Sequence, residues 1–374
     1  MMNGREGTTM ATSFSGMTRR RVATLTSVIA ASLLLAACAG TPTDSNTGAE
    51  SSSDFCERNK AAGKITYISG YGYSASAGQL DVFLAEELGY FDELCLDVEI
   101  NASGANGQQL VASGQAQFTA LGSASDVMLA AANSKNLTAV ATYGTTPPFS
   151  IFGNEKLESL NDLEGNSLGY FINLTPIASA MLDEAGVDTS KVEMVKITNY
   201  DPTVVVRDQV SAIVGYASNQ PQALKAAGEP FVEFLPADFG VKGTYNVMEV
   251  NSQFLAENRE VAADFMRATL KALDFCLTDD EKCIDMIAEL AEENGQGAAF
   301  PREQLARTWA VESEWVRTSE GGNPGVQTAA MWEPEYELVK KYGDVKNLPA
   351  IADMMDADLV ADLYDGDTLT WPSK

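Results

Sequence analysis

The loop at residues 70–77 carries the side chains best suited to contact a small planar molecule. It reads GYGYSASA and joins a predicted strand at residues 65–68 to a predicted helix. The rings of Tyr71 and Tyr73 can stack on an aromatic ligand, for about 0.5–1.5 kcal/mol each beyond burial. Alternatively, one of the two rings packs against the part of the protein that carries the loop and does not face a ligand. Ser74 can donate its hydroxyl to a ligand at the helix start, or simply cap that helix.

Other polar and aromatic side chains follow the ends of further predicted strands. Ser123 and Ala124 open a helix, where free backbone N–H groups suit an anion or a carbonyl, although capping explains the serine nearly as well. Asn219 and Gln220 can each donate and accept hydrogen bonds, which suits the edge of a heterocycle. The remaining candidates end or follow strands in both halves of the chain: Tyr143, Tyr170, Asn173, Thr175 and Tyr216.

These residues need a scaffold that gathers strand ends at one edge, and the apolar pattern predicts it. Strand, polar loop, helix and strand succeed one another over residues 64–100, which is a βαβ unit with a parallel sheet. A second series of the same kind begins at residue 159. Ligands of such sheets bind beyond the carboxyl ends of the strands. Aromatic residues are plentiful there and cations are scarce, so we expect an uncharged aromatic heterocycle.

The chain contains no histidine and has a formal net charge of −27. The missing imidazole excludes Ser-His-Asp and Cys-His catalysis and every metal site that needs a histidine ligand. Carboxylate pairs and nucleophilic lysines are not excluded, so other kinds of catalysis stay open at this point. The acidic surface repels phosphate backbones, so no nucleic-acid partner is expected. We expect no cofactor and no metal site.

Residues 1–37 have the organisation of a secretory signal peptide. Three arginines at 19–21 precede an uncharged stretch at 22–37 that is short for a bilayer span. The stretch runs into the sequence LAAC, which resembles the bacterial lipobox. That resemblance implies cleavage before Cys38 and its lipidation; an ordinary signal peptide with a chance cysteine is the alternative. Residues 38–61 follow as an expected flexible tether.

Four more cysteines can form disulfides outside the cytoplasm, with three possible pairings. We favour Cys276–Cys283, which are close in sequence, and Cys56–Cys95. In the chain-entropy model they contribute about 2.5 and 4 kcal/mol. Buried free thiols are the alternative.

Several short segments have sequences that recur together in one protein family. Residues 88–91 and 96–99 read LGYF and LDVE, similar to a GYF…GLDVE element. Residues 110–115 and 163–169 resemble its LxxGxxD and LKGKxxG segments. Their order and spacing resemble the SsuA/THI5 (NMT1) family of ABC-transporter substrate-binding proteins.

One branch of that family, which binds thiamine pyrimidine precursors or riboflavin, is similar to this chain at residues 216–228 and 236–241. The branch has Asn-Glu-Pro where this chain has Asn219-Gln220-Pro221. The resemblance covers roughly residues 62 to 345.

The resemblance implies an α/β fold of the two-lobed type II periplasmic-binding-protein class. Each lobe would be a mostly parallel sheet flanked by helices, with the ligand cleft between the lobes. Residues 62–152 and 248–374 would form one lobe, and residues 153–247 the other.

The function implied is that of the solute-binding component of an ABC importer, a binding protein and not an enzyme. It would capture an aromatic heterocycle, such as a thiamine pyrimidine precursor or riboflavin, and deliver it to the membrane permease. An alkanesulfonate-, taurine- or nitrate-binding protein of the same fold is the alternative. A sensory lipoprotein without transport is the alternative from another class. We expect a monomer, lipid-anchored at the extracytoplasmic face of the cell membrane.

Overall fold

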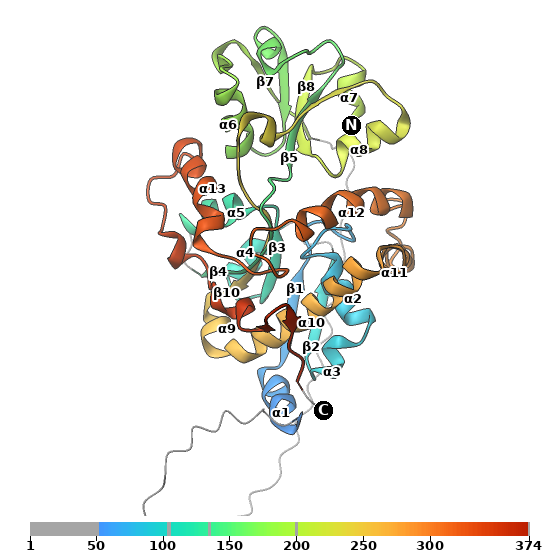
Figure 1. The fold of residues 1–374 in the computed structure, drawn as a ribbon, viewed down its shortest axis with the longest axis vertical. Helices are drawn as coiled ribbons and strands as arrows, with labels where there is room; N and C mark the ends of the chain where they lie inside the picture. Colours follow the sequence, from blue (N-terminus) through green and yellow to red (C-terminus); the bar gives the residue numbers. More distant parts are fainter. Residues whose placement is uncertain (1–51, 103–105, 134–135, 199–200, 373–374) are drawn as a thin grey trace, which may run out of the picture. The chain divides into compact units, whose positions relative to one another are not determined.

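The structure, a computed structural model, describes residues 52–102, 106–133, 136–198 and 201–372. The predicted signal peptide, the predicted lipidation site Cys38 and most of the predicted tether lie outside these residues. Within them the chain builds two five-stranded sheets (Figure 1). We call the sheet that contains the first strand, with its helices, lobe 1, and the other lobe 2. No helix in this part of the chain has the length and apolar character of a membrane span.

The lobe 1 sheet combines four early strands with one that arrives late in the sequence. Strand β1 is parallel to β2 and β3, whereas β10 is antiparallel to β3 and β4. The order across the sheet is β2 (Asp97–Asn101), β1 (Lys64–Ile68), β3 (Phe118–Leu121), β10 (Tyr245–Asn251) and β4 (Leu137–Gly144).

The lobe 2 sheet has the same plan, with β5 as the inserted antiparallel strand. Its order is β7 (Glu193–Lys196), β6 (Ser167–Tyr170), β8 (Ala212–Tyr216), β5 (Phe149–Gly153) and β9 (Val232–Phe234). The predicted boundaries at 153 and 247 are therefore wrong by a few residues. Both β5 and β10 pair along their whole length with the sheet they enter, so the lobes change at 145–148 and 241–244.

Helices cover both faces of the lobe 1 sheet, because its strands are apolar on both faces. One face carries the main core, with Phe118 stacked on Phe265 at 4.1 Å between ring centroids. The helices on that face are α2 (Leu80–Glu87), α3 (Tyr90–Glu93), α10 (Arg259–Thr278), α11 (Asp280–Glu293) and α12 (Arg302–Arg317). The other face carries α4 (Gly107–Ala112), α5 (Ala124–Ala131) and α13 (Ala329–Tyr342).

Lobe 2 is smaller, with helix α6 on one face and α7 and α8 on the other (Figure 1). Thr175 caps α6 by accepting from the N–H of Ala178 at 3.1 Å, and Pro176 occupies the first turn. Gly228 ends α8 in the left-handed conformation, with φ of 71°. The helical elements are α6 (Pro176–Glu184), α7 (Thr203–Val206), α8 (Gln220–Ala227), η1 (Leu160–Leu163), η2 (Thr189–Lys191) and η3 (Pro236–Phe239).

The last part of the predicted tether is not flexible but helical, as α1 (Ser52–Ala62). Phe55 is only 3% exposed, and Asn59 donates to the carbonyl of Leu94 at 2.8 Å. The disulfide Cys56–Cys95 joins this helix to the segment before β2, and Cys276–Cys283 joins α10 to α11. Both pairs are those favoured from the sequence. The remaining elements are α9 (Ser252–Glu257), η4 (Ile351–Asp353), α14 (Asp358–Ala361), β11 (Tyr364–Asp365) and β12 (Thr368–Leu369).

Candidate ligand-binding site

The loops that follow β1, β3 and β8 meet between the lobes. In a parallel arrangement the carboxyl ends of strands share one edge, so the loops after β1 and β3 lie together in lobe 1. The loop after β8 faces them from lobe 2 through contacts of Tyr216 and Ser218. We call the residues around these contacts the interlobe site: Tyr71, Gly122, Asp126, Tyr216, Ser218, Asn219, Tyr245, Asn246, Gln304 and Glu312.

Tyr71 and Tyr216 form the aromatic part of the interlobe site. Their hydroxyl oxygens are 3.1 Å apart, and their rings meet edge to face with centroids 6.0 Å apart. The Tyr216 ring also contacts Phe149 of β5, with a centroid distance of 5.0 Å. Tyr71 remains 39% exposed. The structure thus brings together two predicted residues from opposite lobes, and both offer an aromatic surface and a hydroxyl.

Gly122, directly after β3, permits this close approach of the lobes. A Cβ atom built at Gly122 would lie 2.0 Å from the hydroxyl oxygen of Tyr216 and 3.3 Å from Oδ2 of Asp126. Its φ lies outside the left-handed region, so closeness and not backbone conformation explains the glycine here. A side chain at this position would push lobe 2 away.

Glu312 of α12 links the lobes through a buried carboxylate. It accepts a hydrogen bond from the hydroxyl of Ser218 in lobe 2 at 2.5 Å, and one from Tyr245 in lobe 1. Burial raises its pKa to about 7. Nearby, Gln304 of the same helix donates to Oδ1 of Asn219 at 3.3 Å. Helix α12 is therefore the lobe 1 element that binds the loop after β8.

The sequence contained a signal for Glu312 that the prediction missed. Glu312 lies three residues after Trp309 and four before Val316, on the buried face of α12. A carboxylate within an apolar helical stripe must be hydrogen-bonded or neutralised. Its partners Ser218 and Tyr245 are remote in sequence, so the pattern indicates a buried polar contact but not which one.

The start of α5 is not available to a ligand anion, contrary to the expectation for Ser123 and Ala124. Ser123 caps the helix, and the N–H of Ala124 donates to Thr244 at 2.8 Å. The N–H and hydroxyl of Ser125 both donate to Oε1 of Glu335, at 2.9 and 2.5 Å. The chain's own carboxylate from α13 thus occupies the position where an external anion was expected.

Three more predicted contacts belong to lobe 1 itself. Tyr73 is 6% exposed and stacks on Phe83 at 4.6 Å, so this ring packs against the lobe, the alternative left open from the sequence. Tyr143 is fully buried under α2, and its hydroxyl lies 3.4 Å from Oδ2 of Asp81. The hydroxyl of Ser74 lies 3.0 Å from that of Ser76. The strand-end position of Tyr143 did not bring its ring to the site, because the ring points into the main core.

Several of the predicted residues of lobe 2 likewise have their contacts within their own lobe. Gln220 is 4% exposed, and its Oε1 accepts from the backbone N–H of Tyr216 at 2.8 Å. Its side chain therefore shapes the loop after β8. Thr175 is the cap of α6, and Tyr170 packs partly against the lobe 2 core. Asn173 is exposed in the loop between them. Among the hydrogen bonds of the described residues, none joins Thr175, Tyr170 or Asn173 to lobe 1.

Carboxylates with raised pKa values surround the interlobe site. Burial and the nearby Glu335 raise the pKa of Asp126 to about 6. Burial raises the pKa of Glu249, whose carboxylate accepts from Gln108 at 3.2 Å, to about 8. Burial, then Tyr71, Asp126 and Glu312, raise the pKa of Tyr216 well above its usual value. The groups acting on these side chains are acidic, phenolic or neutral, so the site has an electronegative character.

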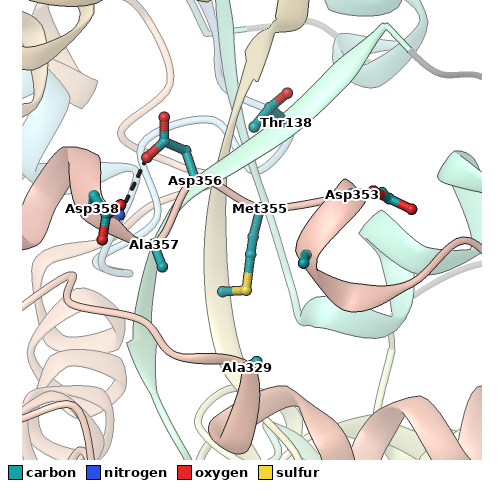
Figure 2. A pocket seen from close by; sticks show the side chains of 8 residues that line it. Thr138, Ala329, Asp353, Met355, Asp356, Ala357 and Asp358 are labelled. Carbon is teal, nitrogen blue, oxygen red and sulfur yellow. Dashed lines mark hydrogen bonds between the residues drawn. The ribbon is translucent and has the colours of Figure 1, made fainter.

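A surface hollow of about 480 Å³ lies elsewhere, beside Thr138 at the start of β4 (Figure 2). Met355 forms a β-bridge with Ala139 there. Asp356 accepts from the N–H of Asp358 at 3.2 Å, the dashed line in Figure 2, and forms an ion pair with Arg259. These contacts hold the C-terminal segment on the sheet and do not make a ligand site.

Two relatives have names that describe what they bind. The formylaminopyrimidine-binding protein of Halalkalibacterium halodurans is 28% identical over 265 residues, which cover 67% of this chain and 78% of the relative. The riboflavin-binding protein RibY of Chloroflexus aurantiacus is 28% identical over 177 residues, 46% of this chain and 50% of the relative.

Solved structures with the same fold include a binding protein and an enzyme. The periplasmic aliphatic sulphonate binding protein SsuA of Escherichia coli matches 78% of this chain and 91% of its own, with 12% identity and a TM-score of 0.58. The enzyme DszB, solved with biphenyl-2-sulfinic acid, matches 80% of this chain and 98% of its own, with 12% identity and a TM-score of 0.57. The fold alone therefore does not separate binding from catalysis.

A family model described as NMT1/THI5 like matches residues 78–283. The match spans more than half of the chain, from the start of α2 through β10 to the second disulfide. It includes both crossings between the lobes and the loops after β3 and β8. The chain therefore belongs to the NMT1/THI5-like family.

Proposed function

We propose that this chain is the solute-binding component of an ABC importer and that it captures a small aromatic heterocycle between its lobes. The carrying observation is the contact of Tyr71 with Tyr216, which come from opposite lobes and are held by separate strand ends. A planar ligand that meets these rings gains contacts from both lobes only when they close. Closure coupled to binding is the event that a permease can recognise.

The identity of the solute is supported by the relatives and by the type of side chain at the site. One relative is named for a formylaminopyrimidine and the other for riboflavin, and both ligands are planar nitrogen heterocycles. Phenol rings suit such ligands. The neutral or acidic groups around Tyr216 suit them better than they suit a sulfonate.

We further propose an extracytoplasmic location, with lipidation of Cys38 as the anchor and a membrane permease as the partner. The sequence LAAC at residues 35–38 and the arginines at 19–21 support this. Two acyl chains would be needed for stable anchoring. The two disulfides fit an oxidising compartment. We propose that the protein acts as a monomer and catalyses no reaction, and the chain has no histidine for the usual acyl-transfer triads.

The test is a calorimetric titration of the purified protein with formylaminopyrimidine, riboflavin, taurine and hexanesulfonate. We expect micromolar or tighter binding of at least one heterocycle. Binding of the sulfonates alone would overturn the heterocycle assignment and leave the solute-binding role. If none of the compounds binds, and native mass spectrometry finds no co-purified small molecule, the solute-binding role itself is wrong.

A further inference from the structure

Asp126 places a carboxylate beside the aromatic pair of the interlobe site. It lies in the first turn of α5 and is half-buried. Its Oδ2 accepts from the N–H of Ser123 at 3.3 Å, which fixes its direction. A Cβ atom built at Gly122 would lie 3.3 Å from Oδ2 of Asp126 and 2.0 Å from the hydroxyl oxygen of Tyr216. The two oxygens therefore lie close to each other, beside Gly122.

Asn246 adds a buried acceptor at the same junction. It is 1% exposed, and its Oδ1 has no hydrogen-bond partner among the residues that the structure describes. Its backbone N–H donates to the carbonyl of Gly122 at 3.0 Å, and its Nδ2 donates to the carbonyl of Ala77 at 2.7 Å. The amide therefore lies between the two loops of lobe 1 that line the interlobe site. Most buried polar atoms are paired, so this oxygen indicates a donor that the described residues do not supply.

The backbone of Asn246 supports a functional origin for this arrangement. Its φ is +37°, in the left-handed region that residues other than glycine rarely adopt. The residue nevertheless lies inside β10, which pairs on both sides. Strained conformations of this kind persist where neighbouring contacts enforce them, and they cluster at ligand sites.

Together these groups offer oxygen acceptors and no positive charge. The groups that perturb Asp126 and Tyr216 are carboxylates, a phenol and backbone donors. None of the lysine and arginine ion pairs among the described residues includes Asp126 or Glu312. An anionic ligand would approach like charge here without compensation.

We propose that Asp126 and Asn246 form an acceptor edge that selects a ligand carrying N–H donors, such as an amino-substituted or protonated nitrogen heterocycle, and that rejects anions. The inference rests on the proposed function and deepens it. The side-chain oxygen of Gln220, at the family's Asn-Glu-Pro position, accepts from the backbone N–H of Tyr216. We therefore assign recognition of the ligand's N–H donors to Asp126 and Asn246 instead.

The test compares matched ligands on matched variants of the whole protein. Formylaminopyrimidine and its analogue without the ring amino group are titrated by calorimetry against the wild type, Asp126→Asn, Asn246→Gly and Asp97→Asn. Asp97 is an exposed carboxylate at the start of β2, at the opposite end of the sheet, so its variant removes the same charge as a control. Glycine at 246 removes the amide while tolerating the left-handed backbone.

We expect Asp126→Asn and Asn246→Gly to weaken binding of the amino-bearing ligand at least tenfold, and Asp97→Asn less than twofold. The preference for the amino-bearing ligand over its analogue should shrink in both site variants, which a merely structural loss would not cause. If both site variants keep the wild-type preference for the amino-bearing ligand, the inference is overturned. It is also overturned if the wild type binds hexanesulfonate more tightly than formylaminopyrimidine, a result that leaves the solute-binding role intact. If the wild type binds none of these ligands, the proposed function is overturned as well.

Discussion

Replacing Gly122 with alanine should block closure of the lobes while leaving each lobe folded. The added Cβ would lie 2.0 Å from the hydroxyl oxygen of Tyr216, whereas a carbon–oxygen contact needs about 3.3 Å. Tyr216 is held by Phe149 on its own lobe and by Tyr71 across the site, so it cannot simply rotate aside. The strain therefore falls on the approach of lobe 2 to lobe 1.

The expected loss of affinity follows from this overlap of more than 1 Å. Overpacking a tight contact costs about 1–3 kcal/mol, which corresponds to a roughly 5- to 150-fold weaker dissociation constant. The φ of Gly122 lies outside the left-handed region, so the backbone tolerates alanine there. The free energy of unfolding should therefore change by no more than about 0.5 kcal/mol, in either direction. The effect should therefore appear in ligand affinity and not in the midpoint of thermal unfolding.

Calorimetry with formylaminopyrimidine and thermal denaturation without ligand measure the two quantities. Gly70→Ala is the matched control, because a Cβ at Gly70 meets no atom within 4 Å. Tyr216→Phe removes the clashing oxygen and leaves the ring carbon at 3.3 Å, so the double variant with Gly122→Ala should bind better than Gly122→Ala alone. Wild-type affinity in Gly122→Ala, or no gain in the double variant, would refute the reasoning.

Three further changes test other parts of the structure. Ser218→Ala removes a hydrogen bond to the buried Glu312 carboxylate, worth about 1.5–3 kcal/mol, so affinity should fall at least tenfold by calorimetry without a lower unfolding midpoint. The pKa of Glu249 is about 8 in the folded protein and near 4.5 when unfolded, so the folded state binds the extra proton between these values. Stability should therefore fall as pH rises from 5 to 8, and urea titrations should show Glu249→Gln reducing that fall by about 3.5 kcal/mol. Replacing Cys56 and Cys95 by serine should lower the free energy of unfolding by about 4 kcal/mol, measured by urea denaturation, and equal stability would contradict the entropic estimate.

Local signals predicted the secondary structure well. The strand predicted at residues 65–68 is β1 (Lys64–Ile68), and α8 ends at Gly228 because glycine adopts the left-handed cap without strain. Helix α13 begins at Ala329, after the Thr328 cap, and contains Pro334 in its interior. A proline inside a helix is uncommon, so a sequence rule that starts a helix at proline does not apply here.

The site was harder to predict because its contacts are remote in sequence. Tyr71 and Tyr216 were predicted separately, yet nothing local indicates that their hydroxyls meet. Tyr143 ends a strand as they do, but its ring faces α2, and the position along a strand does not decide which face a side chain takes. Asn246 shows no sequence signal, because only the paired backbone reveals its left-handed conformation.

The error at Ser123 and Ala124 has the same physical origin as the proposed ligand preference. The N-terminus of α5 has the partial positive charge that attracts an anion, and a carboxylate of the chain itself lies there. That carboxylate is Glu335, which also accepts from the N–H of Thr244 at 2.8 Å and so ties α13 to the second lobe crossing. A ligand sulfonate would have to displace a carboxylate that four donors hold. Asp126 is the other carboxylate at this helix start and is half-buried. Under the proposed preference, a ligand with N–H donors meets Asp126 without displacing Glu335.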